Sequence, residues 1–237
     1  MEKMIKALLE KFKTIKAREN SKHFIKLSTG NKKLVSNDRV SFLIWNIPAI
    51  ITCPFRTALC ERFCYARKAE KYRGASVTTP RKKHFEMSKQ ADFVLNMIFT
   101  IETELARPKN KEKKIVFRIH ESGDFYNRDY ANKWLDIMRY FENNNKLVFV
   151  AYTKSVAYFD GVTLPKNFCL LASVWSDTTP ENMDIIRRNN FRIYTAYKGH
   201  ELELALASGF ARCACVDCAN CGLCWNNFVN NIACEIH

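Results

Sequence analysis

The chain has 237 residues, 47% of them hydrophobic, which is enough to bury a substantial core in one domain. No apolar run approaches the roughly 18 residues needed to cross a bilayer, and charges interrupt the N-terminal segment where a signal peptide would be apolar. We therefore expect a cytoplasmic protein with no membrane partner.

The formal net charge is +14, from 38 Lys and Arg against 24 Asp and Glu. Basic residues gather near the N-terminus and between Arg67 and Lys83. A solvated surface explains this excess more simply than a nucleic-acid-binding one, because few aromatic side chains for base stacking lie among the basic residues. A nucleic-acid partner is therefore open, but charge alone does not establish it.

The first half of the chain contains one predicted strand and two predicted helices. Apolar residues recur at helical spacing between Met4 and Ile15, which predicts an amphipathic helix within a basic N-terminal segment, residues 1–35. The stretch VSFLIWNIP, from Val40 to Pro48, predicts a buried strand. A long helix is expected from about Pro80 to Arg107, with Pro80 as its opening residue.

Strands and helices then alternate. Strands are expected in KIVFRIHESGDF, KLVFVAYTKS, NFCLLASVWSD and FRIYTAY, and helices in NRDYANKWLDIMRYFE and ENMDIIRRNN. This order predicts a parallel α/β sheet. The connection from Ser155 to Asn167 is too short for a full helix, so residues 40–200 are expected to form an incomplete (β/α) barrel or an open, curved sheet.

Eight of the 10 cysteines fall into two groups. The first group, Cys53, Cys60 and Cys64, follows the first predicted strand. The second group comprises Cys213, Cys215, Cys218, Cys221 and Cys224. Thiols this closely spaced suit metal ligation better than a disulfide framework, particularly in a reducing compartment. We expect residues 210–237 to form a cysteine-rich metal-binding loop that takes its order from the metal.

The spacing of the second group favours iron–sulfur chemistry over zinc. Cys215, Cys218 and Cys221 form the C-x-x-C-x-x-C core with which ferredoxins hold a [4Fe-4S] cluster. Structural zinc needs only four ligands, so the surplus of thiols favours one or more iron–sulfur clusters, [4Fe-4S] or larger, in an oxygen-sensitive protein. The eight thiols divide between two sites or converge on one. Cys169 is expected to be a buried apolar residue and Cys234 a tail thiol without a near neighbour.

The motifs ITCP-x4-C-x3-CYARK and RIHESGDFYNRDYANKW, with the terminal cysteine knot ending in CW, resemble the bacteriophage gene product 88 family from Cys53 to Trp225. The layout more distantly resembles the radical S-adenosylmethionine (SAM) enzymes, in which three cysteines after the first strand hold a [4Fe-4S] cluster and SAM binds its fourth iron. In that pattern the third cysteine would fall at Arg67, so Cys53 would supply the missing ligand.

The radical SAM resemblance also implies cofactor-binding residues beyond the cysteines. Gly123 and Asp124 match the acidic glycine turn that receives the SAM amino group, whereas the structural alternative makes Asp124 a helix cap near Asn127. Tyr65, beside Cys64, and His120, at a strand end, complete the candidates, although His120 suits a structural role somewhat better. Lys154, Ser173 and Asp177 are pocket candidates because they lie at predicted strand ends.

Three functions remain open from the sequence. The first is an iron–sulfur protein on a radical-SAM-like barrel, with a redox or electron-transfer task and an electron donor as partner, in the host cytoplasm if a phage encodes it. The second is an active radical SAM enzyme with an auxiliary cluster, which would make SAM a cofactor. The third is a zinc-stabilised nucleic-acid-binding protein.

Overall fold

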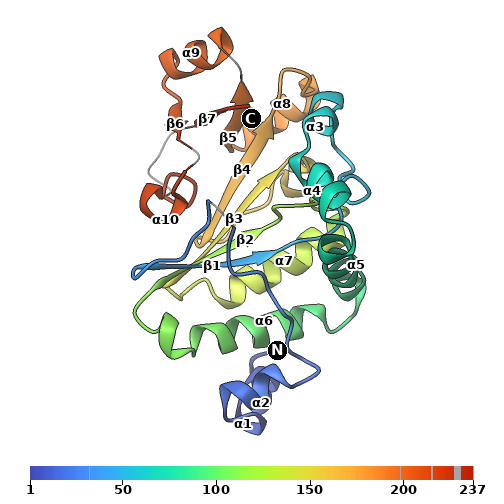
Figure 1. The fold of residues 1–237 in the computed structure, drawn as a ribbon, viewed down its shortest axis with the longest axis vertical. Helices are drawn as coiled ribbons and strands as arrows, with labels where there is room; N and C mark the ends of the chain where they lie inside the picture. Colours follow the sequence, from blue (N-terminus) through green and yellow to red (C-terminus); the bar gives the residue numbers. More distant parts are fainter. Residues whose placement is uncertain (32, 198, 215, 227–230, 237) are drawn as a thin grey trace.

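The computed structural model describes the chain except for residues 32, 198, 215, 227–230 and 237. The described strands form one parallel sheet in the order β1-β2-β3-β4-β5-β7-β6, which curls into an open half-barrel (Figure 1). The predicted α/β class and incomplete barrel are thus confirmed. The strands are β1 (Val40–Trp45), β2 (Lys114–Ile119), β3 (Leu147–Thr153), β4 (Phe168–Val174), β5 (Arg192–Tyr197), β6 (Ala211–Cys213) and β7 (Ile232–Glu235).

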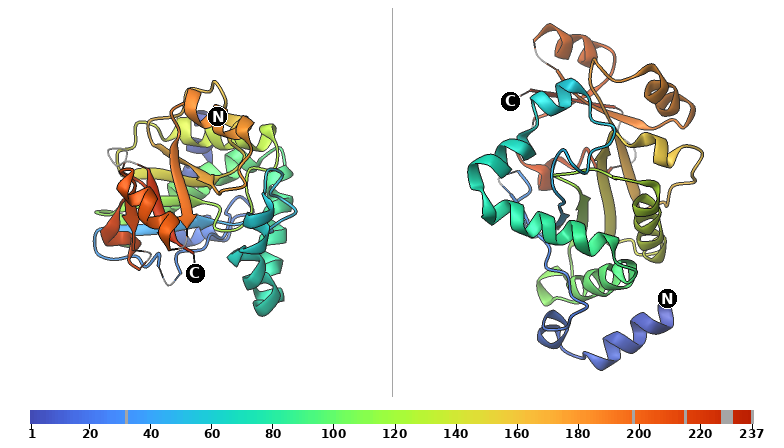
Figure 2. Two further views of the ribbon diagram at one scale, coloured as in Figure 1. Left: turned by 90° about the horizontal axis from the view of Figure 1, so that it is seen from above. Right: turned by 90° about the vertical axis from the view of Figure 1, so that its right-hand side faces the viewer.

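The larger core lies between the sheet and the helices on its convex face. There Phe117 and Phe149 pack with Trp134 of α7 (Arg128–Tyr140), next to α6 (Phe93–Leu105). The short connection after β3 contains only the 3-10 helix η2 (Val156–Phe159), as its length predicts. The remaining helices on this side are α1 (Glu2–Lys11) and α2 (Ile15–Glu19), which pack on α6, together with α8 (Pro180–Arg188) and η1 (Pro108–Asn110) (Figures 1 and 2).

The concave face carries a second, smaller core. Alternate residues of the central strands, among them Val116, Val150 and Leu171, point to this side. Cys213 and the segment 218–225, which begins with the short helix α10 (Cys218–Cys221), cover part of it. Toward the carboxyl ends of the strands the concave face becomes polar and aromatic, with Arg118 on β2 and Tyr152 on β3.

The predicted long helix is wrong as one element. The chain forms α4 (Tyr65–Arg73), then α5 (Ala75–Lys89), and α6 starts only after a break. Pro80 lies inside α5 instead of opening it. Gly74 sets the start of α5, because its φ of 52° lets the chain turn between α4 and α5. A glycine at this position is visible in the sequence.

The tail was expected to be a loop, and this expectation is also wrong. It contributes β6, α10 and β7, and the helix α9 (His200–Ala207) precedes it. β7 inserts between β5 and β6, and its Ile232, Ala233 and Cys234 are buried. The last strands therefore take their order from sheet pairing and apolar burial, as the other strands do.

The free edge of β1 is covered by the chain that precedes it. Ser28 pairs with Ile44 in an isolated antiparallel bridge, with backbone bonds of 3.1 and 2.7 Å. Ser36 Oγ accepts from Phe42 N at 3.1 Å, and Asn37 N donates to Val40 O at 2.9 Å. Most outward backbone groups of β1 are thereby satisfied. Among the described helices none is long and apolar enough to span a bilayer.

His120 lies in the helix-covered core. Its Nε2 is 2.9 Å from the hydroxyl of Tyr130, which accepts from Trp45 Nε1 at 2.8 Å. Its ring packs edge-on against Phe125. Burial, and secondarily the charge of Arg118, lowers the pKa of His120 to about 3, so the ring is neutral at physiological pH.

This predicts a pH dependence of stability. Unfolded histidine has a pKa of about 6.5, so between that pH and about 3 the unfolded chain binds a proton that the folded chain does not. The free energy of unfolding should therefore fall as pH falls. Between pH 7 and 5 the parent should lose about 2 kcal/mol more than His120→Gln in urea denaturation, since the carboxylate contributions are common to both. Equal losses would contradict the buried neutral ring.

Candidate functional site

The three cysteines of the first group converge at the carboxyl end of the sheet. Cys53 lies on the loop after β1, Cys60 in α3 (Ala58–Arg62), and Cys64 is the N-cap of α4, where its sulfur accepts from Arg67 N at 3.4 Å. All three are half-buried free thiols. They are near enough for charges on Cys60 and Cys64 to raise the pKa of Cys53. The fold thus gathers the first predicted ligand group at one place.

Ionisable groups from other strands surround these thiols. Burial, then the carboxylate of Asp124, raises the pKa of Cys53 to about 12. Burial also raises the pKa of Cys60, which the positive charge of Lys154 partly offsets. Burial lowers the pKa of Lys154 to about 8, and its Nζ donates to Ser173 O at 2.7 Å. A cation that binds here would displace thiol protons.

The loop that carries Cys53 is fixed to the turn after β2. Asn46 Oδ1 accepts from the backbone N–H groups of Glu121 and Ser122, at 2.8 and 3.0 Å. Ile47 N donates back to Ser122 O at 3.1 Å. Gly123 has a φ of 83°, and a Cβ on it would lie 2.3 Å from Ile47 Cγ1 and 2.6 Å from Thr52 Oγ1. Glycine is required at this position because the loop packs directly against its backbone.

Asp124 joins the same turn to the end of β3. Its carboxylate accepts from Thr153 Oγ1 at 2.6 Å, from Lys154 N at 2.9 Å and from Phe125 N at 2.8 Å. Burial raises its pKa, and these hydrogen bonds oppose that rise. The alternative of a helix cap is wrong, since Asn127 caps α7 by accepting from Tyr130 N. Asp124 instead holds neighbouring strand ends together beside Cys53.

The other two predicted cofactor-binding residues, Tyr65 and His120, lie at the rim of the half-barrel and in the core. Tyr65 stands at the rim, 60% exposed, and donates from its hydroxyl to Glu121 O at 2.5 Å. His120 belongs to the core between the sheet and α7, as described above. Gly123 and Asp124 therefore lie beside the Cys53 loop, and Tyr65 adjoins Cys64 in the chain, whereas His120 lies away from the first cysteine group.

The second cysteine group gathers on the concave face of the half-barrel. Cys213 and Cys218 act electrostatically on Cys224, which also bonds with the hydroxyl of Tyr152. Burial raises the pKa of Cys224 to about 12. Cys221 is exposed, and Cys215 lies outside the described residues.

Cys234 extends this second group. It lies buried in β7, in register with Cys213 of β6, and its sulfur accepts from Tyr194 OH at 3.0 Å. The expectation of a tail thiol without a neighbour is wrong, because the sequence signal for β7 is only four residues long. Cys169 is 2% exposed on the same concave face, as expected of a buried apolar residue.

The two groups occupy different sides of the mouth. α3 and α4 stand on one side and α10 on the other in both views from the front and from above (Figures 1 and 2). Arg118 lies between them, since its charge acts on both Tyr65 and Cys224. Within the described residues no three Cys, His, Asp or Glu side chains are arranged as a ready site for one metal ion.

Two further residues contribute groups of functional interest. Asp177 Oδ2 accepts from Leu59 N of α3 at 2.8 Å, while Oδ1 is buried without a hydrogen-bond partner among the described residues. Its place at a strand end already marked it as a pocket candidate. Arg118 was not singled out, although a lone charge within the apolar run KIVFRI is a recognisable signal.

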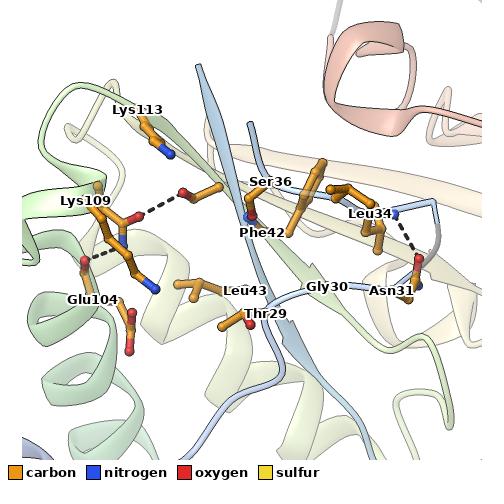
Figure 3. A pocket seen from close by; sticks show the side chains of 13 residues that line it. Thr29, Gly30, Asn31, Leu34, Ser36, Phe42, Leu43, Glu104, Lys109 and Lys113 are labelled. Carbon is orange, nitrogen blue, oxygen red and sulfur yellow. Dashed lines mark hydrogen bonds between the residues drawn. The ribbon is translucent and has the colours of Figure 1, made fainter. Parts of the chain in front are cut away.

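A cavity of about 460 Å³ lies elsewhere, beside the amino-terminal half of β1 (Figure 3). Its polar walls are partly bonded to one another: Ser41 Oγ is 2.8 Å from Asn110 Oδ1, and Leu34 N donates to Asn31 Oδ1. None of the cysteines lines it. The cysteine groups are therefore not part of this cavity.

These features define an open α/β half-barrel with two thiol groups at its mouth. The profile of the family described as gene product 88 matches residues 14–227, so the chain belongs to that family. The Gene 88 protein of Mycobacterium phage D29 is 29% identical over 203 residues, and that of Mycobacterium phage L5 is 28% identical over 200. Each match covers 74% of this chain and 78% of the relative. No solved structure matches.

Substituting Gly123 tests how the Cys53 loop is held. Gly123→Ala should lower the free energy of unfolding by about 2–4 kcal/mol, from an unfavourable φ and from the collision with Ile47 and Thr52. Gly161→Ala is the matched control, because Gly161 has a φ of 68° with nothing within 4 Å of the added carbon, and it should cost about 1 kcal/mol. Urea denaturation measures both. Equal costs would show that the loop does not depend on this contact.

Proposed function

We propose that this protein binds an iron–sulfur cluster through Cys53, Cys60 and Cys64 on a radical-SAM-like half-barrel, and that its task is redox chemistry or electron transfer. The observation that carries the proposal is the convergence of these three half-buried thiols from a loop and two short helices. They meet beyond the carboxyl ends of the parallel strands, where folds of this kind place their chemistry.

The arrangement of the thiols supports a cluster over a single zinc ion. Structural zinc needs only four ligands, whereas the two groups together hold eight thiols. A cluster with several irons accepts ligands that are farther apart, and three thiolates suit its iron–sulfide core. Lys154, beside Cys60, would supply a positive charge next to the anionic cluster.

The second cysteine group supports a separate auxiliary cluster. Cys213, Cys218 and Cys224 lie together, away from the first group and across Arg118. The hydroxyl of Tyr152 bonds with Cys224, and a hydrogen bond to a ligating sulfur shifts the reduction potential of a cluster. Two clusters within one mouth would suit the passage of electrons from a donor protein.

A catalytic radical SAM activity is the second candidate. The first group has three thiols, which would leave one iron of a [4Fe-4S] cluster for another ligand. Asp124 is less suited to receive the SAM ammonium than its position in the turn indicated, because three protein donors already occupy its carboxylate. Asp177 Oδ1 is a protein oxygen that could serve as the fourth ligand and so occupy the iron that SAM would need. Electron transfer is therefore the preferred assignment.

Metal analysis tests the proposal. Protein purified without oxygen should be brown and contain iron and acid-labile sulfide. Cys60→Ser and Cys224→Ser should each remove about half of the iron, since each breaks one of two clusters. Cys169→Ala, a buried cysteine outside the proposed ligands, should keep the iron. Colourless protein that holds stoichiometric zinc after anaerobic reconstitution would refute the iron–sulfur assignment, and complete iron loss in either serine variant would indicate one shared cluster.

Incubation with SAM separates the two candidate functions. The reduced, iron-loaded protein should produce no more than a trace of 5′-deoxyadenosine, because the preferred assignment has no open iron for SAM. Chromatography of the reaction mixture measures the product. Multiple turnovers that disappear in Cys60→Ala would establish the enzyme instead.

A further inference from the structure

Arg118 is a half-buried cation near the carboxyl end of β2, on the concave face of the sheet. Its neighbour on the same face, Val116, is 2% exposed. The guanidinium carbon lies 4.4 Å from the centre of the Tyr152 ring, so an aromatic face holds it in place. A positive charge is therefore held against an aromatic ring where the apolar part of the concave face ends.

This charge has no partner within the part of the chain that the structure describes. No hydrogen bond or ion pair reaches the guanidinium there, and Nε is buried without an acceptor. Glu121, the one carboxylate among the neighbours whose charge acts on it, is engaged by the side-chain amides of Asn31 and Asn46. Nε is thus removed from water without an acceptor, which is costly, and an anion bound to the guanidinium would supply one.

The neighbours of Arg118 come from both sides of the mouth. Tyr65 belongs to α4, and Cys224 follows α10. Burial raises the pKa of Tyr152 and of Cys224, so near pH 7 both are neutral and give the guanidinium no negative charge, while the guanidinium itself stays protonated. The group is therefore a permanent cation. Its planar fork of N–H donors matches the two oxygens of a carboxylate or phosphate.

We propose that Arg118, backed by the Tyr152 ring, binds the carboxylate or phosphate group of a small-molecule ligand between α4 and the segment 218–225. The ligand would then lie between the two cysteine groups. The inference goes beyond the proposed cluster chemistry and does not require a cluster. The competing account makes the Cys224 sulfur the permanent partner of Arg118, with no ligand.

Calorimetric titration of the full chain with inorganic phosphate and with malonate, at constant ionic strength, tests the proposal. Saturable binding of at least one anion is expected, and the tighter of the two identifies the chemistry of the ligand group. Arg118→Gln should weaken this binding at least tenfold. Arg118→Lys should restore part of it, because lysine keeps the charge but not the fork. Arg139→Gln, which removes a surface arginine paired with Asp136 on α7, should bind as the parent does.

Urea denaturation without added anion separates the two accounts. If Arg118 has no permanent anionic partner, the free energy of unfolding of Arg118→Gln should be at least that of the parent, because the substitution removes an unpaired cation. A less stable Arg118→Gln whose anion binding is unchanged would make Arg118 the partner of Cys224 and overturn the proposal. Failure of both anions to bind the parent would also overturn it. Neither result depends on iron content, so these experiments test the anion site independently of the cluster proposal.

Discussion

The cysteine site depends on the hydrogen-bonded contact between the loop after β1 and the turn after β2. One carboxamide, that of Asn46, accepts from two successive backbone N–H groups of the turn. Gly123 then lets the loop lie directly on the turn, and Asp124 extends the connection to β3. Three strand ends are thereby joined, and Cys53 is held where Cys60 and Cys64 arrive from the following helices. Without this contact the loop that carries Cys53 would have no hydrogen-bonded support from the turn after β2.

The electrostatics of the site follow from the same arrangement. Asp124, Asp177 and the thiols Cys53 and Cys60 are potential anions gathered in a half-buried place, with Lys154 as the opposing charge from β3. Burial, and then repulsion by the neighbouring anions, makes the two thiols resist ionisation while the site lacks a further cation. The iron of the proposed cluster would supply that positive charge, and its binding would reverse the cost of deprotonating the thiols.

Much of the fold could be predicted because parallel strands have a clear signature. Apolar runs alternating with amphipathic helices indicated β1 to β5, and the short link after β3 indicated an open barrel. The prediction was wrong where local signals conflicted. Pro80 is typical of the first turn of a helix, yet α5 begins after Gly74 and contains Pro80. β6 and β7 were missed because short strands gain their order only from partners distant in sequence. The role of Cys234 and the position of Arg118 between the groups depend on that long-range pairing, which no local pattern contains.

The segment before β1 has a consequence for association between copies. A parallel sheet that does not close has two edges, and an exposed edge invites strands from other chains. Here Ser28, Ser36 and Asn37 already occupy outward backbone groups of β1, and the opposite edge, β6, is only three residues long. Neither edge of the described sheet therefore offers a long row of free backbone groups as a template for polymerisation.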